Sequence, residues 1–285
     1  MIKFINYFFQ ALIVYLFFLL GKLIGLNLSR KLFSFVFLKI GPFFKSKKII
    51  FQNLENYKSN ISPTEKEKIV SNMWKNYGCT FIEYVFLNYF RKHSGHVKVE
   101  GETIVKNISI KAKPVIFISG HFSNFELMSM QITKTNISLA AIYRPLNNYF
   151  LNPFMEYLRK KYVCKKQIKK GINGVREAID FINKGVSIAL MIDQRVSEGE
   201  KINFFGKPAL TTTLPAQLAI KYNLKIVPVF IERDKKNDFR IKFFEEIDPT
   251  KFNDKFDLSK KLNNILEMMI KSNPNEWIWS HNRWK

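Results

Sequence analysis

The sequence has very little cysteine. Its 285 residues include two, Cys79 and Cys164, which are too few and too scattered for a disulfide framework or a zinc site. A reducing compartment is the simple interpretation, although two buried thiols would look the same. His93 and His96 have an H-x-x-H spacing, but no Cys or second pair of His lies nearby in the sequence. We therefore expect loop residues there and no metal site.

Several stock motifs are also missing. The patterns GxGxxG, GxxxxGKS/T, GxSxG and HExxH do not occur. The dinucleotide-binding, P-loop, serine-hydrolase and zincin classes therefore lose their main support. Disordered and collagen-like proteins are excluded as well, because 47% of the residues are hydrophobic and can fill a core.

Acidic residues are scarce relative to basic ones. The 46 Lys and Arg exceed the 23 Asp and Glu, which gives a formal net charge of +23. Such an excess repels itself unless an anionic partner offsets it. Nucleic acid, an anionic membrane surface, an acidic protein and a phosphorylated substrate all qualify. Part of the excess reflects a general bias toward Lys, Ile, Asn and Phe, so the charge alone does not identify the partner.

An uncharged hydrophobic run lies at residues 4–21, FINYFFQALIVYLFFLLG. Its 18 residues are at the short limit for a helix that spans ~30 Å of hydrocarbon. A cleavable signal peptide is a poor alternative, because no small-x-small cleavage site follows the run. The other alternative is a buried hydrophobic helix in the core of the protein.

A second apolar block, residues 32–44, is rich in Phe and is interrupted by Lys39. It suits an interfacial helix better than a second span. Lys3 is the only side-chain cation before the first run, and many cations follow it, so the positive-inside rule predicts that everything downstream is cytoplasmic. We expect a membrane anchor with an interfacial helix over residues 1–44 and a separate domain over residues 45–285.

The rest of the sequence alternates between helical and strand-like segments. SPTEKEK at 62–68 is typical of a capped helix start. Further helical patterns run from 124 onward and over 150–162, 171–184, 213–223 and 258–272. Strands are predicted at VKVEG (97–101), PVIFIS (114–119), ISLAAIY (137–143), VSIALMI (186–192), KIVPVFI (225–231) and FRIKFFEEI (239–247). This alternation predicts an α/β fold with a mainly parallel mixed sheet flanked by helices.

One segment, FISGHFSNFELM at 117–128, combines a strand end with ionisable side chains. The strand ends at Ser119, Gly120 permits a tight turn, and His121 emerges where open α/β sheets place their sites. If His121 precedes the helix, its ring can meet the Glu126 carboxylate. That contact would fix the tautomer and raise the basicity of the other nitrogen, as a general base for an alcohol requires. The alternative is a histidine satisfied in a strand-to-helix turn.

Five further blocks accompany this H-x4-E pattern. They are YRP (143–145), IDQ (192–194), FFGKPALTTTLPAQLA (204–219), VPVFIER (227–233) and WIWSHNRWK (277–285). In this order and spacing they resemble the lipid A biosynthesis acyltransferase family, the late acyltransferases that attach secondary fatty acyl chains to the lipid A precursor of Gram-negative bacteria. The resemblance covers essentially the whole chain. It implies a fold like that of glycerolipid acyltransferases and an acyltransferase domain over residues 45–285.

The resemblance also implies the reaction and the site. The family transfers a fatty acyl group from an acyl carrier protein thioester to a hydroxyl of an anionic, phosphorylated lipid, at the cytoplasmic face of the bacterial inner membrane. It needs no metal, cofactor or nucleic acid. By analogy, His121 is the general base and Glu126 its orienting partner. The expected substrate-binding residues are Arg144 at a phosphate, Asp193 and Arg233 at the same sheet edge, and Phe205 and Gly206 in the turn that shapes the substrate mouth.

The sequence departs from the family's usual GHxGNWE motif at two positions, with Ser123 where Gly is common and Phe125 where Trp is common. These changes keep the two ionisable residues but leave the shape of the pocket, and therefore the acceptor, open. No cysteine lies in a nucleophile motif, so we favour direct attack in a ternary complex over an acyl-enzyme. The oxyanion donors are either backbone N–H groups near Gly120 or cationic side chains.

A basic stretch follows, and it is either a solvated helix face or a docking surface for an acidic carrier protein or phosphorylated headgroups. Its members are Arg159, Lys160, Lys161, Lys165, Lys166, Lys169, Lys170 and Arg176. Two other functions stay open. One is the same chemistry on a lysophospholipid, an amino-acid lipid or another glycolipid. The other is a non-catalytic basic protein that binds an anionic membrane or nucleic acid, although no RNA-binding signature is present.

Overall fold

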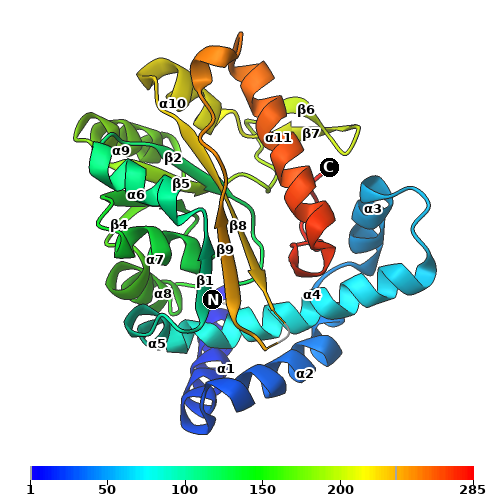
Figure 1. Ribbon diagram of the computed structural model, residues 1–285. Coiled ribbons are helices and arrows are strands. Elements are labelled where there is room, and N and C mark those ends of the chain that lie inside the picture. Colours follow the sequence, from blue (N-terminus) through cyan, green and yellow to red (C-terminus); the bar gives the residue numbers. More distant parts are fainter. Residues whose placement is uncertain (1, 235) are drawn as a thin grey trace.

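A seven-stranded sheet forms the centre of the computed structural model, which describes residues 2–234 and 236–285. The strand order is β1-β9-β8-β2-β5-β3-β4. The five strands from β8 to β4 run parallel, whereas β9 pairs antiparallel with β8 and parallel with β1. The predicted α/β fold with a mainly parallel mixed sheet is therefore confirmed (Figure 1).

All six predicted strands are present, five with shorter bounds and β8 ending two residues later than predicted. They are β1 (Val97–Glu100), β2 (Ile116–Ser119), β3 (Leu139–Tyr143), β5 (Ser187–Met191), β8 (Ile226–Arg233) and β9 (Phe239–Phe243). Three strands were not expected. They are the edge strand β4 (Lys166–Lys169) and the separate antiparallel hairpin of β6 (Glu200–Phe204) and β7 (Lys207–Thr211).

Helices cover both faces of the sheet. On the first face lie α6 (Glu102–Lys111), α7 (Glu126–Lys134), α8 (Asn152–Leu158) and the short α5 (Leu87–Lys92). On the second lie α9 (Ile172–Asn183), α10 (Leu214–Tyr222) and α11 (Lys255–Ser272). Successive β2 side chains alternate between the two cores, with Phe117 in the first and Ile116 and Ile118 in the second. Because the parallel strands run in the same direction, their carboxyl ends lie at one edge of the sheet.

Four helices precede the sheet in the chain: α1 (Ile2–Ile24), α2 (Leu26–Phe44), α3 (Lys47–Tyr57) and α4 (Pro63–Glu83). The long helix α4 crosses the base of the sheet, with α1 and α2 beside it (Figure 1). It begins as predicted, because the Ser62 hydroxyl accepts the N–H of Glu65 at 3.1 Å. The block at 32–44 lies within α2, which packs against α4.

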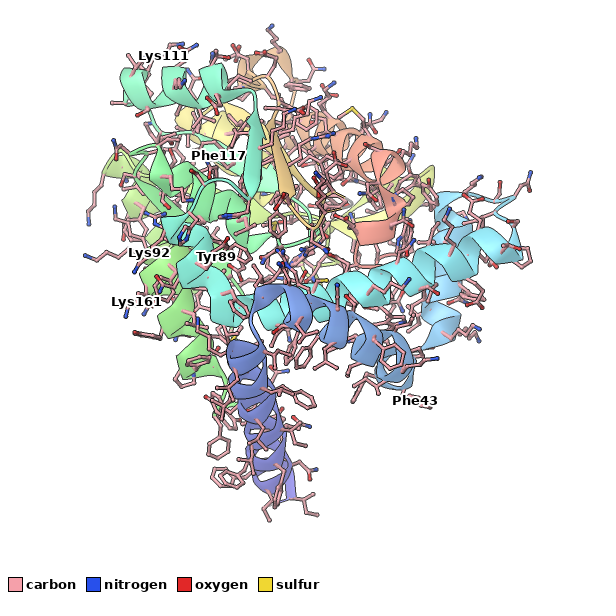
Figure 2. All side chains as sticks on the ribbon, turned by 60° about the horizontal axis from the view of Figure 1, so that its bottom comes forward. Phe43, Tyr89, Lys92, Lys111, Phe117 and Lys161 are labelled. Carbon is pink, nitrogen blue, oxygen red and sulfur yellow. The ribbon has the colours of Figure 1, made fainter. Side chains whose placement is uncertain are left out.

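Helix α1 contains the predicted hydrophobic run. It is long and apolar enough to cross a membrane, with a mean hydropathy of 1.9 over its best window, of which 17% is buried in the protein. Figure 2 shows α1 projecting from the body of the molecule. This exposure disfavours the alternative of a buried core helix. Met1, which belongs to the expected anchor, lies outside the described residues.

Candidate active site

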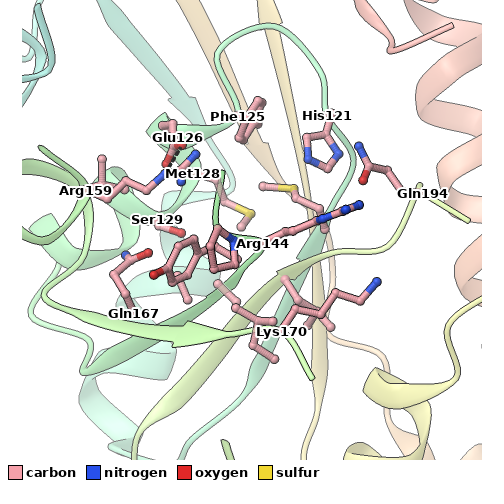
Figure 3. A pocket seen from close by; sticks show the side chains of 18 of the residues that line it. His121, Phe125, Glu126, Met128, Ser129, Arg144, Arg159, Gln167, Lys170 and Gln194 are labelled. Carbon is pink, nitrogen blue, oxygen red and sulfur yellow. Dashed lines mark hydrogen bonds and ion pairs between the residues drawn. The ribbon is translucent and has the colours of Figure 1, made fainter. Parts of the chain in front are cut away.

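A pocket of about 400 Å³ opens at the carboxyl edge of the parallel strands. The neighbours β2, β5, β3 and β4 all run in the same direction, so the residues that follow them meet at this edge. The pocket wall includes His121 after β2, Arg144 after β3, Lys170 after β4 and Gln194 after β5 (Figure 3). Open α/β sheets generally place ligands at such an edge.

His121 is held there by a buried carboxylate from the neighbouring strand. Its ring nitrogen Nδ1 lies 2.8 Å from Asp193 Oδ1, and its backbone N–H donates to Asp193 Oδ2 at 2.8 Å. The indole N–H of Trp277 donates to the same Oδ2 at 2.9 Å. Because β2 and β5 are paired, two side chains 72 residues apart in the sequence meet just beyond the strand ends.

Burial and charge fix which nitrogen of His121 carries the proton. Burial alone would raise the pKa of Asp193, but the charge of His121 and the hydrogen bonds from its ring, its backbone and Trp277 lower it. An ionised carboxylate only accepts hydrogen bonds, so in the neutral ring Nδ1 donates and Nε2 keeps the lone pair. Burial alone would lower the pKa of His121, but Asp193 raises it. The pair therefore makes Nε2 a stronger base.

Asp193 was expected among the substrate-binding residues, and its surroundings do not support that role. The side chain is fully buried, and its two oxygens are occupied by His121 and Trp277. A carboxylate in this position acts on the imidazole and is shielded from a ligand in the pocket. The expected place at the sheet edge is correct, because Asp193 follows β5 by two residues.

Glu126 points away from His121, and the expected hydrogen bond between them is wrong. Its carboxylate oxygen Oε1 accepts from Nε of Arg159 at 2.7 Å and from the hydroxyl of Tyr84 at 2.6 Å. The ring of Phe125 packs edge-on against the imidazole, with centroids 4.7 Å apart, and separates it from Glu126 (Figure 3). Glu126 still lines the pocket, as one half of a buried ion pair with Arg159.

The turn between β2 and α7 depends on Gly120. A Cβ atom at this position would lie 2.7 Å from the ring of Phe122 and 3.3 Å from Cβ of Asp193. Glycine thus allows Asp193 to approach the backbone of His121. Ser123 adopts a φ of 45°, in the left-handed region that disfavours residues with side chains.

The backbone N–H groups of this turn are already used within the protein. Those of residues 121–123 donate in order to Asp193, to the oxygen of Gly120 and to the oxygen of Glu276. They are therefore poor candidates for stabilising an oxyanion. Of the two kinds of donor considered from the sequence, cationic side chains fit the structure better.

The pocket combines positive charge with an apolar wall. Arg144 and Lys170 line it, whereas the charge of its third cation, Arg159, is balanced by Glu126. The apolar lining includes Met128, Ile142, Leu146, Val163, Met191 and Leu214. Such a pocket suits a ligand that joins an anionic group to a hydrocarbon chain, because the two parts need opposite environments.

Arg233 was expected to bind substrate, and its contacts do not support this role. It closes β8 at the expected sheet edge, but its side chain is 6% exposed and its guanidinium binds the buried Glu83. The same carboxylate accepts from Nε of Arg30 on α2 at 2.6 Å and from the amide of Asn124 at 2.9 Å. Arg233 therefore belongs to a buried charge cluster that ties α2 and α4 to the turn after β2.

Phe205 and Gly206 form the turn between β6 and β7, with φ of 52° and 73°. The turn is as expected, but its role at the substrate mouth is not supported. Phe205 packs against Tyr57 and Trp284. The pocket is instead reached by Thr212, just after the hairpin.

The basic stretch at 159–176 is divided by the structure. Arg159 is buried, so the expectation that it belongs to a surface patch is wrong. Lys165 precedes β4, whereas Lys169 and Lys170 lie at its carboxyl end, beside the pocket. Lys165, Lys169 and Lys170 are all exposed, and of these three only Lys170 lines the pocket.

The two histidines at 93 and 96 serve packing. His93 stacks on Tyr89 with centroids 4.5 Å apart, and the buried His96 packs beside Phe90. Burial lowers the pKa of His96 to about 4. Over residues 2–234 and 236–285, no group of three or more His, Cys, Asp or Glu side chains is arranged to hold a metal ion.

Several residues of the site were missed from the sequence. Trp277 lies in the WIWSHNRWK block, so that block was the available signal for a structural partner of the histidine. Tyr84 lies in an aromatic stretch, EYVFLNYF, in which nothing distinguishes it from its neighbours. Lys170 was counted in the basic stretch, but its place in the pocket depends on β4, which was not predicted.

Comparisons with known proteins give a match to one family model. The sequence matches a family model described as bacterial lipid A biosynthesis acyltransferase over residues 2–285. No curated protein matches the sequence significantly. Among solved structures, the chain is similar to the crystal structure of the 1-acyl-sn-glycerophosphate (LPA) acyltransferase PlsC from Thermotoga maritima, with 16% sequence identity and a TM-score of 0.43 over 88% of this chain and 98% of that chain. A similarity of this size identifies no substrate.

Proposed function

The chain belongs to the bacterial lipid A biosynthesis acyltransferase family, and on this basis we propose that it moves a fatty acyl chain from an acyl carrier protein thioester to a hydroxyl of a lipid A precursor. The observation that carries the proposal is the pocket at the carboxyl edge of the sheet. It brings together a histidine made more basic by Asp193, the cations Arg144 and Lys170, and an apolar wall.

In the proposed reaction, Nε2 of His121 takes the proton of the acceptor hydroxyl as its oxygen attacks the thioester carbonyl. The tetrahedral intermediate then collapses, the carbon–sulfur bond breaks, and the imidazolium returns the proton to the leaving thiolate. The products are an ester and the free thiol of the carrier. Asp193 keeps the ring in one orientation and stabilises the imidazolium, while both substrates are bound together.

Glu126 has a different role in this proposal. Through Arg159 and Tyr84 it fixes the pocket wall, and it completes a buried ion pair whose disruption would leave an uncompensated charge. Its loss should therefore impair turnover severely, as the loss of an orienting partner would. An orienting partner would raise the basicity of His121, whereas the ion pair of Glu126 with Arg159 leaves that basicity nearly unchanged.

Arg144 is the proposed partner for a phosphate of the acceptor. It is exposed at the pocket, its planar guanidinium can bind a phosphate through two hydrogen bonds, and Lys170 adds positive charge beside it. The expected anchor, α1, would hold the chain at the cytoplasmic face of the bacterial inner membrane, where an amphiphilic acceptor is concentrated.

The test is an acyl-transfer assay on membranes that carry the full chain. Labelled acyl carrier protein is supplied with a lipid A precursor, its dephosphorylated form, a lysophospholipid or an amino-acid lipid. We expect acylation of the precursor, and a loss of roughly 10²–10⁴-fold in turnover for His121→Ala without unfolding. Arg144→Ala should raise KM for the phosphorylated acceptor more than for the dephosphorylated one, and Arg144→Lys should not fully restore it.

Three results would contradict the proposal or one part of it. An active His121→Ala enzyme, with contamination by the host enzyme excluded, would show that His121 is not the general base. Acylation of the lysophospholipid or the amino-acid lipid alone would keep the chemistry and replace the acceptor. If Arg144→Ala lowers only kcat, equally for both forms of the precursor, the phosphate contact is wrong.

A further inference from the structure

A short segment between β3 and α8, residues 146–151, lies along α1. The hydroxyl of Tyr15 donates to the backbone oxygen of Phe150 at 2.7 Å. The side-chain amide of Asn148 donates to the backbone oxygen of Tyr7 at 2.8 Å. The segment is thus fixed to the apolar helix by two hydrogen bonds between parts of the chain more than a hundred residues apart.

Aromatic contacts extend this attachment toward the start of α1. The ring of Phe150 lies edge-on to Phe4 at 5.0 Å and to Phe8 at 5.5 Å between centroids. From Phe4 to Tyr15 the helix rises about 16 Å, at 1.5 Å per residue. If α1 alone crossed a bilayer with ~30 Å of hydrocarbon, it would carry this segment through much of the hydrocarbon. Helix and segment therefore have to share one depth.

Three backbone N–H groups of the segment are bonded to side chains within the protein. The N–H of Leu146 donates to Asn152 Oδ1 at 2.8 Å, and those of Phe150 and Leu151 donate to Asn148 Oδ1 at 3.0 and 3.2 Å. A loop in water does not need such partners, since water supplies them. A loop in contact with lipid does, because unpaired N–H groups are costly in hydrocarbon.

The outward side chains of the segment continue the apolar surface of α1. Tyr149 is 65% exposed and Leu146 is 40% exposed. Leu146 also lines the pocket, so it belongs to both surfaces. The large apolar residues exposed on α1 are Ile2, Phe4, Ile5, Phe8, Phe9, Leu12, Ile13, Tyr15, Leu16, Leu19, Leu20 and Leu23.

Tyrosines and lysines flank this surface. Tyr89, Lys92 and Lys161 gather beside the end of the body from which α1 projects (Figure 2). All three are exposed, and Lys161 contacts the exposed Tyr157. Tyrosine and lysine are typical of the headgroup level of a membrane, where lysine also attracts anionic lipids.

We propose that residues 146–151 insert beside α1 into the interfacial region of an anionic phospholipid bilayer and form the membrane-side lip of the pocket. An amphiphilic acceptor then passes over Leu146 from the bilayer into the pocket without crossing water. The depth is shallow, with Lys92 and Lys161 at the headgroups. This inference rests on the proposed anchoring of the chain by α1, but adds a second contact that the helix alone does not require.

The test measures membrane depth at three single positions of the full chain. A spin label is attached to Tyr149→Cys in the segment, to Leu12→Cys on α1 and to Ile110→Cys on α6. Ile110 is 80% exposed and adjoins Lys111, which lies at the end of the molecule opposite α1 (Figure 2). The two native cysteines are buried, so the parent protein serves as the labelling blank. Vesicles contain phosphatidylethanolamine and phosphatidylglycerol.

We expect the labels at 149 and 12 to lose accessibility to a water-soluble relaxation agent and gain it to oxygen, whereas the label at 110 stays aqueous. If the label at 12 is protected and the label at 149 is as accessible as that at 110, the lip is overturned and the anchoring by α1 stands. If all three stay accessible, both are overturned.

A second measurement connects the lip to turnover. Tyr149 does not line the pocket, so Tyr149→Asp should lower the rate with an acceptor in vesicles and leave the rate with the same acceptor in detergent micelles unchanged. Ile110→Asp is the matched control and should change neither rate. An equal loss for Tyr149→Asp in both media would overturn the proposed route, because it would indicate a structural defect.

Discussion

The carboxylate of Asp193 is the residue on which the chemistry of the pocket depends most. Removing a charge from water is costly unless hydrogen bonds replace the lost hydration. Asp193 receives three, from the ring and the backbone of His121 and from the indole of Trp277. These bonds keep it ionised, and its charge in turn holds the proton of His121 on Nδ1.

The pH dependence of turnover should reveal which carboxylate acts on His121. A base must be neutral, so kcat/KM should rise with pH through the raised pKa of His121, above the ordinary value of about 6.5. Asp193→Asn removes the charge that raises this pKa, so the rising limb should move to lower pH while the maximal rate falls by roughly 10²–10⁴-fold. Glu126→Gln should lower the rate and leave the limb nearly in place.

The measurement is kcat/KM against pH for the three proteins, with the free energy of unfolding as a control for folding. A limb that moves for Glu126→Gln and stays for Asp193→Asn would restore Glu126 as the orienting partner.

Ser123 offers a test of backbone strain at the same turn. In the left-handed region, a residue with a side chain is less stable than glycine by roughly 1–2 kcal/mol. Replacing it with glycine recovers only part of this energy, because glycine raises the conformational entropy of the unfolded chain. Ser123→Gly should therefore stabilise the protein by on the order of 0.5–1 kcal/mol. Ser109→Gly, inside α6, should destabilise it, because glycine is a poor helix former. Denaturant unfolding of both variants measures the two changes. Equal losses in the free energy of unfolding would show that Ser123 is not strained.

At the scale of elements, α2 and α4 are joined through glycines that allow the helices to approach closely. A Cβ atom at Gly78 would lie 2.0 Å from the backbone oxygen of Phe33 on α2, and one at Gly41 would lie 2.3 Å from the ring of Trp74 on α4. Backbone atoms cannot move aside as a flexible side chain can. The contact therefore fixes how the N-terminal helices meet the rest of the protein.

Substituting Gly78 by Ala should force α2 away from α4 and lower the free energy of unfolding by roughly 1–3 kcal/mol, as overpacking does. Gly95→Ala is the control, because nothing lies within 4 Å of a Cβ atom there and its φ is ordinary. Thermal unfolding in detergent measures both variants. Equal melting temperatures for the two would show that the helices tolerate a wider spacing.

The predicted elements were those whose own residues carry a clear signal. The buried strands β2, β5 and β8 are runs of β-branched and aromatic residues, and they were found. The edge strand β4 reads KQIK, with a single buried side chain, Ile168, so it carries almost no hydrophobic pattern. Buried and exposed side chains alternate along β6 and β7, but the FFG block that contains β7 was interpreted only as a family motif.

The site was predictable only as far as the strand end that carries His121. Its position follows from a local pattern, a strand, a glycine and a helix start. Its partner does not, because the contact with Asp193 depends on β2 and β5 being neighbours in the sheet. The order of strands is a property of the folded chain, and the nearby Glu126 was the natural choice from spacing alone.

At the scale of the whole molecule, the position of β4 determines which lysines of the basic stretch lie near the pocket. Lys165 immediately precedes this strand and Lys169 ends it, so the two lie about 13 Å apart at 3.3 Å per residue. Both are exposed, and Lys169 immediately precedes Lys170, which lines the pocket. A carrier protein that delivers its thioester to His121 has to approach the end that carries Lys169. The two lysines therefore form a matched pair for testing docking.

Lys169→Glu should raise KM for the acyl carrier protein several-fold at low ionic strength, and leave kcat and the acceptor's KM unchanged. The effect should shrink at 0.15 M salt, where the Debye length falls to about 8 Å and screens long-range attraction. Lys165→Glu changes the net charge by the same amount at the far end of the strand, so it should have a much smaller effect. Steady-state kinetics with each substrate varied separately, at both ionic strengths, provide the comparison. Equal effects of the two charge reversals would mean that the carrier responds to the overall charge of the protein. A loss confined to kcat would mean that Lys169 stabilises the structure of the pocket and does not bind the carrier.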